Sequence, residues 1–157
     1  MTWRVGLGFD VHPFSPDPTR RLVLGGVELD GPGLAGHSDA DVLAHAVCDA
    51  LLGAGGLGDL GSLFPDDDPA WEGADSMGLL AHVVSVVGSE WTVGNVDCSI
   101  VLEAPRLAPH RAEIEANLTK TVGATVSVKA KRAEGLGALG RREGIACWAV
   151  ALIESRE

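Results

Sequence analysis

The stretch SDADVLAHAVCDALL, residues 38–52, gives the strongest indication of the fold. Its apolar residues recur every three or four positions, which is the period of an amphipathic helix. These residues are Val42, Leu43, Ala46, Val47, Ala50 and Leu51. Ser38 or Asp39 can cap the start of the helix and Gly53 can end it. The stretch therefore predicts an amphipathic helix over residues 38–52.

Working outward from this helix, the chain alternates between further strand and helix patterns. We expect strands at 3–12, 21–29, 94–102, 127–133 and 145–153. We expect two more helices, one from Ser76 to about Val87 capped by Asp75, and one over 109–122 with Pro109 in its first turn. The glycine-rich stretches 55–71 and 134–144 are interpreted as loops. The order β-β-α-α-β-α-β-β predicts an α+β domain, with a mixed sheet covered by helices on one face.

The composition fits one globular domain spanning residues 1–157. A hydrophobic fraction of 46% with 22% charged residues excludes wholesale disorder. Twelve basic residues against twenty-two acidic ones give a formal net charge of −10, which repels nucleic acid and anionic membranes. No apolar run approaches the roughly 20 residues that span a bilayer. We therefore expect neither nucleic acid nor membrane as a partner.

The cysteines and the N-terminal residues both indicate a cytoplasmic location. Cys48, Cys98 and Cys147 are odd in number, widely spaced and without a CxxC pair, which excludes a cysteine zinc cluster. We interpret them as buried thiols in a reducing compartment. Residues 1–4 lead directly into a strand pattern, without the apolar region and cleavage site of a secretion signal.

Three residues have the chemistry of a metal site. Asp10 and His12 are two positions apart on a predicted strand, so their side chains share one face. His45 lies on the predicted helix, on the same side as Asp41 and Asp49. One carboxylate and two imidazoles are a ligand set typical of catalytic zinc with an open fourth position. Separate surface or core residues are the alternative, and the spacing alone favours that alternative.

Three further groups of polar residues have both a functional and a structural interpretation. His37, Ser38 and Asp39 precede the predicted helix, where free N–H groups favour a phosphate, but on local grounds simple capping by Ser38 or Asp39 is the favoured interpretation. The acidic residues Asp59 and 66–68 could bind hydroxyl groups or a cation, or form a solvated turn.

The third group is a local basic cluster in this acidic chain. Lys129, Lys131 and Arg132 lie beside Glu134, with the arginines at 141–142 nearby. These residues could hold phosphate groups, or they could form a charged strand face. The segment GLGALGRR, 135–142, is not a P-loop because no GK[ST] follows its glycines.

Several motifs along the chain occur in an order found in one known family. They are GFDVH (8–12), LVLGGV (22–27), GHSDADVLAHAVCDALLGAGGLGDLGSLFPDDDP (36–69), GADS (73–76), GNVDCSI (94–100), APRLAPH (104–110), VKA (128–130), GLG (135–137) and GRREGIA (140–146). Together they resemble the 2-C-methyl-D-erythritol 2,4-cyclodiphosphate synthases over almost the whole chain. The resemblance implies that family's α+β fold and a homotrimer with active sites between neighbouring subunits.

The resemblance also implies a lyase of non-mevalonate isoprenoid biosynthesis. The family converts 4-diphosphocytidyl-2-C-methyl-D-erythritol 2-phosphate into the cyclic diphosphate and CMP. The substrate's own 2-phosphate attacks the β-phosphorus of its diphosphate, so the protein positions the substrate and neutralises charge. Two alternatives remain: a catalytically weak CDP-binding relative, and a general metal-dependent phosphohydrolase, which ranks last.

The matching motifs carry the family's site residues onto this chain. Asp10, His12 and His45 resemble the ligands of one zinc ion per subunit, and Glu134 resembles the ligand of a Mg²⁺ or Mn²⁺ ion on the substrate diphosphate. His37 matches a residue that stabilises the transition state. The positions that match substrate contacts are Asp10, Val11, His12, His37, Ser38, Asp59, Leu60, Gly61, Phe64, Pro65, Asp66, Asp67, Asp68, Leu102, Glu103, Ala104, Pro105, Arg106, Leu107, Ala108, Lys131, Arg132, Ala133, Glu134, Ala138 and Arg141.

The chain departs from the family at two places. Lys131, Arg132 and Ala133 stand where the family usually has threonines before the glutamate. Arg132 occupies the position of a threonine that stabilises the transition state, and we assign it that catalytic role because arginine pairs strongly with phosphate. The same replacement motivates the hypothesis of a weak CDP-binding relative. Ala138 replaces a phenylalanine that lines a cavity on the trimer axis, so we do not expect isoprenoid binding there.

Overall fold

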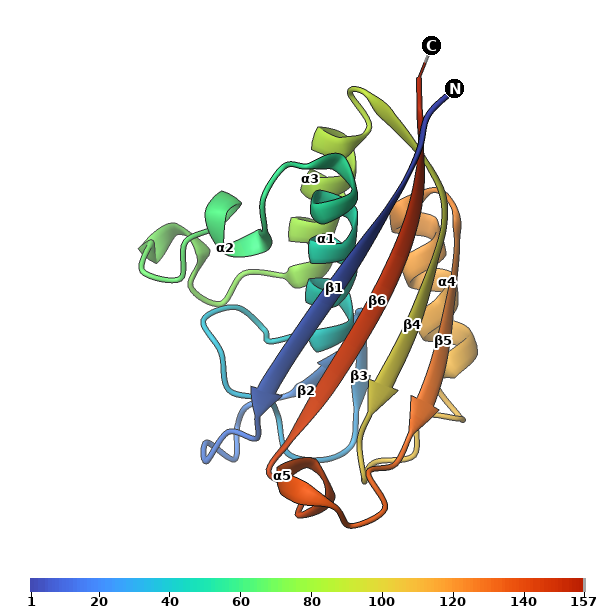
Figure 1. The fold of residues 1–157 in the computed structure, drawn as a ribbon. Helices are drawn as coiled ribbons and strands as arrows, with labels where there is room; N and C mark the ends of the chain where they lie inside the picture. Colours follow the sequence, from blue (N-terminus) through green and yellow to red (C-terminus); the bar gives the residue numbers. More distant parts are fainter. Residues whose placement is uncertain (157) are drawn as a thin grey trace.

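The central element of the fold is a four-stranded mixed sheet, seen in the computed structural model, which describes residues 1–156. Its strands lie in the order β1-β6-β4-β5 (Figure 1). Their bounds are β1 Trp3–Pro13, β6 Gly144–Ser155, β4 Trp91–Val101 and β5 Thr125–Lys131. Strands β1 and β4 both pair antiparallel with β6, whereas β5 pairs parallel with β4. The parallel pair requires a crossover, which a helix between β4 and β5 provides.

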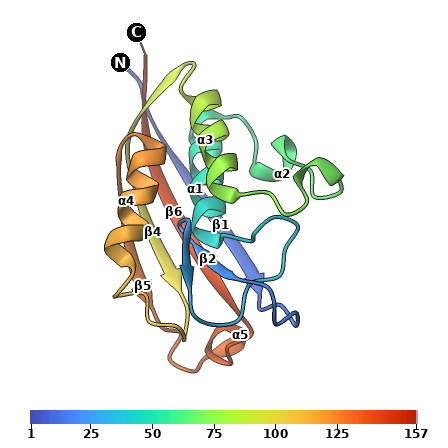
Figure 2. The same ribbon diagram turned by 180° about the vertical axis from the view of Figure 1, so that it is seen from behind.

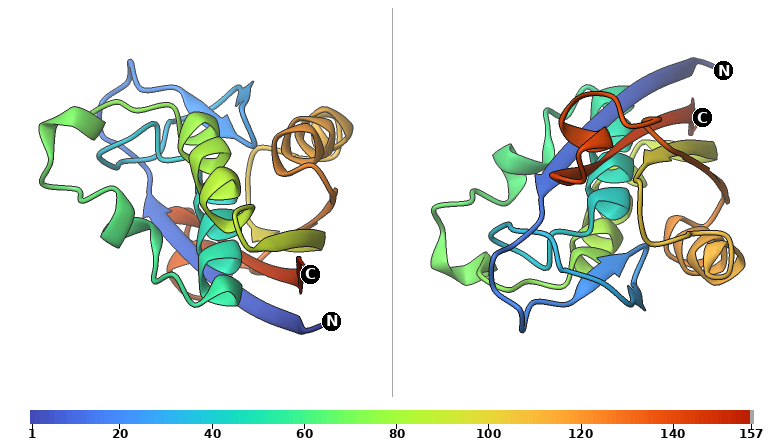
Figure 3. Two further views of the ribbon diagram at one scale, coloured as in Figure 1. Left: turned by 90° about the horizontal axis from the view of Figure 1, so that it is seen from above. Right: turned by 90° about the horizontal axis from the view of Figure 1, so that it is seen from below.

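Three helices cover one face of this sheet, as the side and end views show (Figures 1, 2 and 3). They are α1 Val42–Gly55, α3 Ser76–Val87 and α4 Arg111–Val122. Helix α1 lies against β1 and β6, α4 lies against β5, and α3 packs on α1 and α4. The predicted α+β fold, with a mixed sheet and helices on one face, is confirmed. Among residues 1–156, no helix is long and apolar enough to cross a bilayer.

Strand β1 has two different faces because successive side chains point to opposite sides of a strand. Val5, Leu7, Phe9 and Val11 are exposed on the open face of the sheet. The helix-facing positions hold Gly6 and Gly8, followed by Asp10 and His12. A Cβ atom at Gly8 would lie 1.9 Å from the Ala46 carbonyl oxygen of α1, and one at Gly6 would lie 1.9 Å from that of Ala50. Glycine at these two positions therefore lets α1 approach β1 closely.

Helix α1 begins later than the sequence pattern predicts. It starts at Val42, with Asp41 as the N-cap, so the predicted start at Ser38 or Asp39 is wrong. Ala40 has a φ of 56°, and this left-handed backbone interrupts any helix that begins before it. The helix also continues past Gly53 to Gly55, and Gly56 forms its left-handed C-cap.

The predicted strand 21–29 is a hairpin of two short strands, β2 Leu22–Leu24 and β3 Val27–Leu29. Gly25 and Gly26 have φ values of 56° and 72°, which place a tight turn in the middle of the predicted strand. The two adjacent glycines were the available signal for this turn.

The remaining differences from prediction are local. Helix α3 and its Asp75 cap are confirmed. Helix α4 starts at Arg111 with His110 as its N-cap, so Pro109 lies outside the first turn. The predicted loops contain short helices: α2 Leu60–Leu63, the 3₁₀ helix η1 Pro69–Trp71, and α5 Gly137–Gly140. A single domain over 1–157 remains a prediction, because Glu157 lies outside the described residues.

Asp41 joins the β2–β3 hairpin to the start of α1. Its fully buried carboxylate accepts hydrogen bonds from the backbone N–H groups of Gly25, Gly26 and Ala44 at 2.9, 2.8 and 3.1 Å. Burial raises the pKa of Asp41 to about 6, although these three hydrogen bonds favour its charged form.

We expect Asp41→Ala to lower the free energy of unfolding by about 3 kcal/mol, because it removes a helix cap and leaves buried N–H groups unpaired. Denaturant unfolding followed by circular dichroism would measure this loss. Asp30→Ala is the matched control, because Asp30 is an exposed acid beside the same hairpin. Equal stability of the two variants would contradict the anchoring role of Asp41.

Candidate active site

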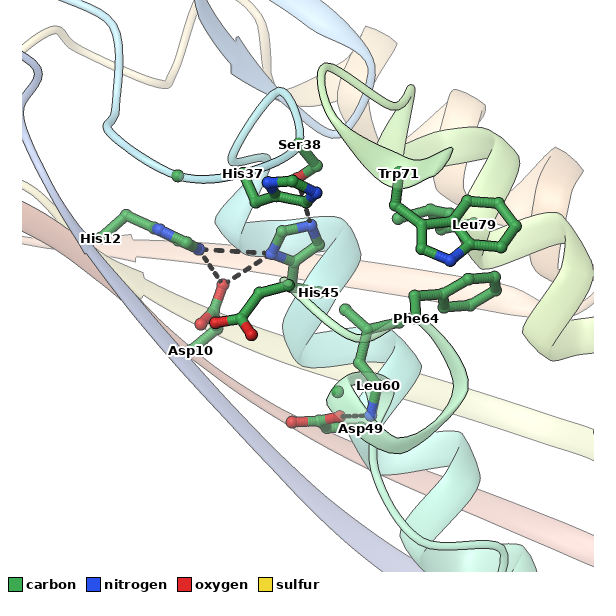
Figure 4. A pocket seen from close by; sticks show the side chains of 13 residues that line it. Asp10, His12, His37, Ser38, His45, Asp49, Leu60, Phe64, Trp71 and Leu79 are labelled. Atoms are coloured by element: carbon green, nitrogen blue, oxygen red, sulfur yellow. Dashed lines mark hydrogen bonds and ion pairs between the residues drawn. The ribbon is translucent and has the colours of Figure 1, made fainter. Parts of the chain in front are cut away.

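Asp10, His12 and His45 converge at one wall of a cavity, although they come from two different elements (Figure 4). Asp10 and His12 lie on the helix-facing side of β1, and His45 lies in the first turn of α1. The Asp10 Oδ2 atom lies 2.8 Å from His12 Nε2 and 3.0 Å from His45 Nδ1. His12 Nε2 and His45 Nδ1 lie 3.3 Å apart. We call these three residues the triad.

The triad is partly withdrawn from water, which strengthens its internal electrostatics. Burial disfavours the carboxylate of Asp10, but hydrogen bonds from both histidines outweigh this effect and lower its pKa to about 2. Burial also disfavours a charged His12, but its hydrogen bond to Asp10 and the negative charge of that residue raise its pKa above the usual value. The triad therefore keeps a negative charge at its centre.

The triad fits a divalent metal ion. The ligand atoms of all three residues lie within 4.8 Å of one another. His12 Nδ1 donates to the Ala35 carbonyl oxygen at 2.8 Å, so Nε2 is the atom that can bind a metal ion, which would displace the hydrogen atom shared with Asp10. His45 Nε2 lies 2.8 Å from Ser76 Oγ, on the side away from Asp10. Histidine ligands of metals characteristically make such a second hydrogen bond with the other ring nitrogen.

The cavity in front of the triad has a volume of about 360 Å³. Nine of the predicted site residues line it: Asp10, His12, His37, Ser38, His45, Leu60, Gly61, Phe64 and Asp66. His37 is held by a hydrogen bond between its Nε2 and the Asp68 carbonyl oxygen at 3.0 Å. The Ser38 side chain is buried, and its Oγ lies 3.2 Å from His45 Nε2, behind the triad (Figure 4).

Other predicted residues support this cavity or lie away from it. Asp59 caps α2 by accepting from the N–H and the hydroxyl of Ser62 at 2.8 and 2.7 Å. Pro65 and Asp67 are exposed near the cavity, and Val11 lies on the open face of the sheet. Their predicted contacts with substrate stay predictions.

The sequence interpretation omitted three side chains that line the cavity. Asp49 accepts a hydrogen bond from the Leu60 N–H at 2.7 Å, so it holds the start of α2 at the cavity edge. Its position one helical turn after His45 was the available signal. Trp71 packs edge-on against Phe64, with ring centroids 4.8 Å apart, and Leu79 completes the wall. No local pattern distinguishes Trp71 and Leu79 from ordinary core residues.

A second pocket, of about 200 Å³, lies where β4 and β5 end. Its lining consists of Leu102, Glu103, Pro105, Arg106, Leu107, Ala108, Ala130, Lys131 and Arg132. Glu103 accepts a hydrogen bond from the Ala133 N–H at 2.6 Å, which ties the two segments together. Ala104 contributes instead to a neighbouring pocket with Arg142. The predicted substrate contacts of residues 102–108, apart from Ala104, therefore share one pocket with Lys131 and Arg132 of the basic cluster.

The two pockets have no residue in common, and β1 and β5 form opposite edges of the sheet. Glu134, Ala138 and Arg141 lie near α5, in the exposed segment between β5 and β6. One chain therefore does not bring Glu134 or Arg132 into the cavity of the triad.

Comparison with known proteins places this arrangement in a family. The sequence model of the YgbB family matches residues 3–154. The chain belongs to the YgbB family. This membership confirms the resemblance found in the sequence motifs. The curated 2-C-methyl-D-erythritol 2,4-cyclodiphosphate synthase of Thermosynechococcus vestitus is 49% identical, and the match covers 99% of this chain and 98% of that protein.

Other YgbB relatives are longer, or have been solved with a ligand. The bifunctional enzyme IspD/IspF of Anaeromyxobacter dehalogenans is 51% identical over 94% of this chain. This chain spans only 39% of that relative's length, and the same share of a second bifunctional relative. The solved CDP complex of Plasmodium falciparum IspF has a TM-score of 0.85 and 30% identity, covering 99% of this chain and 97% of that one.

Proposed function

We propose that the chain is a lyase that converts 4-diphosphocytidyl-2-C-methyl-D-erythritol 2-phosphate into 2-C-methyl-D-erythritol 2,4-cyclodiphosphate and CMP, in non-mevalonate isoprenoid biosynthesis. The observation that carries this function is the convergence of the triad at a cavity that His37 also lines. Membership of the YgbB family and the names of relatives near 50% identity support it. Nothing in the comparisons favours the weak CDP-binding alternative.

In this reaction, an oxygen of the substrate's 2-phosphate forms a bond to the β-phosphorus, and the bond from that phosphorus to the departing CMP oxygen breaks. The protein has to hold the two phosphate groups in line and stabilise their charge. A zinc ion on the triad would supply Lewis-acid polarisation of a phosphate oxygen. His37 lies beside the triad in the same cavity, where its imidazole can contact a phosphate group.

The second pocket is the proposed site for the cytidine diphosphate part of the substrate. Residues 102–108 form one wall, and Lys131 and Arg132 supply positive charge at the other. Arginine can donate two parallel hydrogen bonds to phosphate oxygens, which supports its assignment in place of threonine. The CDP complex of the related P. falciparum protein supports nucleotide binding. Glu134 is proposed to hold Mg²⁺ or Mn²⁺ on the diphosphate.

A homotrimer would join the two pockets. The substrate has to reach both, yet they share no residue within one chain. The open face of the sheet is apolar, with Leu7 67% exposed and the rings of Phe9 and Trp148 in contact there. Exposed apolar patches of this kind mark protein interfaces. We propose that three copies pack through these faces, so that each active site combines pockets of neighbouring subunits.

Substitution of Leu7 tests the trimer. We expect Leu7→Lys to give a native mass of one chain instead of three and to abolish cyclase activity, because a buried unpaired charge opposes association. Multi-angle light scattering after gel filtration measures the mass. Ala81→Lys adds the same charge at an exposed position of α3 and should leave the mass unchanged. A Leu7→Lys protein that keeps the mass of three chains would contradict this interface.

The proposed activity is tested by supplying the purified protein with Zn²⁺, Mg²⁺ and the cytidine diphosphate substrate, and following phosphorus NMR. We expect CMP and the cyclic diphosphate in equal amounts, and neither after the metals are chelated. A folded, metal-loaded trimer that forms neither product would overturn the proposal. Binding of CDP with very slow turnover would favour the alternative, and Arg132→Thr should then raise the rate.

The remaining proposals concern the cellular location of the protein and the partners that it does not bind. We propose a cytoplasmic enzyme, because relatives with this name are biosynthetic enzymes and the cysteines Cys48, Cys98 and Cys147 are free and buried. The net charge of −10 supports the absence of nucleic acid and anionic membranes as partners. Cell fractionation of the native host tests the location.

A further inference from the structure

A line of hydrogen bonds runs behind His45, away from the cavity, and the proposed reaction does not use it. Ser76, the first residue of α3, is fully buried, and its Oγ lies 2.8 Å from His45 Nε2. The Ser76 hydroxyl donates a short hydrogen bond to Asp39 Oδ1. The other Asp39 oxygen accepts from the Ser76 backbone N–H at 3.2 Å. Asp39, Ser76 and His45 thus connect the loop before α1 with the first turns of α1 and α3.

The chemistry of these groups fixes the direction of each hydrogen bond. A carboxylate only accepts, so the single hydroxyl proton of Ser76 is donated to Asp39. Ser76 Oγ then offers only lone pairs to His45, and the hydrogen atom between them belongs to Nε2. Ser38 extends the same pattern, because its Oγ accepts from the Ala40 N–H at 3.1 Å and lies 3.3 Å from Ser76 Oγ. The Ser38 hydroxyl therefore donates to Ser76.

This arrangement determines which nitrogen of His45 can bind a metal ion. Nε2 keeps its hydrogen atom for Ser76, so the available atom is Nδ1, whose contact with Asp10 Oδ2 at 3.0 Å a metal ion would replace by displacing the hydrogen atom between them. We propose that Asp39 and Ser76 are positioning residues that fix the tautomer and ring orientation of His45, so that Nδ1 can bind a divalent metal ion. The inference rests on the metal site of the proposed function.

The two histidines of the triad differ in the hydrogen bond made by the ring nitrogen that faces away from Asp10, which is Nδ1 in His12 and Nε2 in His45. His12 donates to a backbone carbonyl, that of Ala35, which side-chain substitution does not remove. His45 depends on the Ser76 side chain and, through it, on Asp39. Substitution of Ser76 or Asp39 can therefore weaken metal binding by His45 without changing a metal ligand or a residue that lines the cavity.

The test measures binding of Co²⁺, whose visible absorption reports its ligands, in protein stripped of metal. We expect Ser76→Ala to weaken Co²⁺ binding about 10- to 100-fold, the usual effect of losing an outer-shell partner of a metal ligand. Ser38→Ala/Ser76→Ala should weaken it at least as much, since the second serine oxygen is also removed. Asp75→Ala is the matched control, because Asp75 caps the same helix at the neighbouring position, through Met77, without touching His45.

Nitrogen-15 NMR of the histidines gives a second readout that does not depend on activity. In the Zn²⁺-loaded wild-type chain we expect His45 to keep its hydrogen atom on Nε2 and to bind the ion through Nδ1, and in Ser76→Ala we expect signals from binding through either nitrogen. A wild-type chain that binds Zn²⁺ through Nε2 of His45 would overturn the inference. So would a Ser76→Ala protein that binds Co²⁺ as tightly as the wild type.

The outcomes separate this inference from the proposed function. A folded wild-type chain that binds no Co²⁺ removes the proposed metal site, and with it the role assigned to Asp39 and Ser76. Tight Co²⁺ binding by the wild type, unchanged in both serine variants, keeps the metal site and removes only the positioning role. Weaker binding in Asp75→Ala equal to that in Ser76→Ala would assign the effect to the start of α3, and would also overturn the inference.

Discussion

His45→Ala should abolish both divalent-metal binding and CMP release while leaving the chain folded. The substitution leaves Asp10 and His12 as the only members of the triad, and two ligands rarely retain a divalent ion. Even the loss of an outer-shell partner costs about 10- to 100-fold in metal affinity or activity, so loss of a ligand should cost more. Metal content after dialysis, together with product formation, measures both effects.

The control for this variant is a histidine outside the triad. His82 is exposed on α3, where its ring contacts Phe64, and His82→Ala should keep the metal. Circular dichroism measures whether the chain stays folded, and so shows whether the ion serves the reaction or the structure. Loss of the fold in His45→Ala, matched by unfolding of the wild type after chelation, would mean that the metal stabilises the structure rather than the reaction.

We expect Gly8→Ala to lower the free energy of unfolding by about 3 kcal/mol or more, at the upper end of overpacking effects. The new Cβ would lie 1.9 Å from the Ala46 carbonyl oxygen, so α1 has to move away from β1. Ala46 follows His45 directly, and Asp10 lies two positions after Gly8. The same displacement should therefore separate the ligands and weaken metal binding.

Gly53→Ala controls for the change of glycine to alanine. Gly53 lies within α1, and the nearest atom to an added Cβ is 3.9 Å away, so this variant should be neutral or stabilised by up to about 1 kcal/mol. Denaturant unfolding and Co²⁺ titration give the two readouts. A Gly8→Ala protein that unfolds like the wild type, or binds Co²⁺ equally well, would contradict the close approach of β1 and α1.

Periodicity predicted the arrangement of β1 well, because strand geometry is a local property. The spacing of two between Asp10 and His12 placed both on one face. It did not indicate which helix approaches that face, since the approach depends on the absence of side chains at Gly6 and Gly8 and involves a partner about forty residues away. The residue types suggested His45 as a third ligand beside Asp10 and His12, and the resemblance to a known family favoured that hypothesis over separate surface or core residues.

The start of α1 was harder to predict because Ser38, Asp39 and Asp41 are all good capping residues. Which one caps depends on the left-handed backbone of Ala40, and that conformation is fixed by long-range contacts of its neighbours. Once Asp41 is the cap, Ser38 and Asp39 are free to contact α3. Their tertiary role could not be read from a local pattern.

The two faces of β1 also bear on how this sequence can change over generations. Between residues 5 and 12, every other position either is a glycine against α1 or belongs to the triad, and the positions between them hold the exposed apolar residues of the open face. A surface strand ordinarily has a solvent side on which substitutions accumulate without consequence. With the open face packed in the proposed trimer, neither side offers that freedom, so a saturation mutagenesis library should show intolerance at consecutive positions of β1, without the alternating tolerance typical of an edge strand.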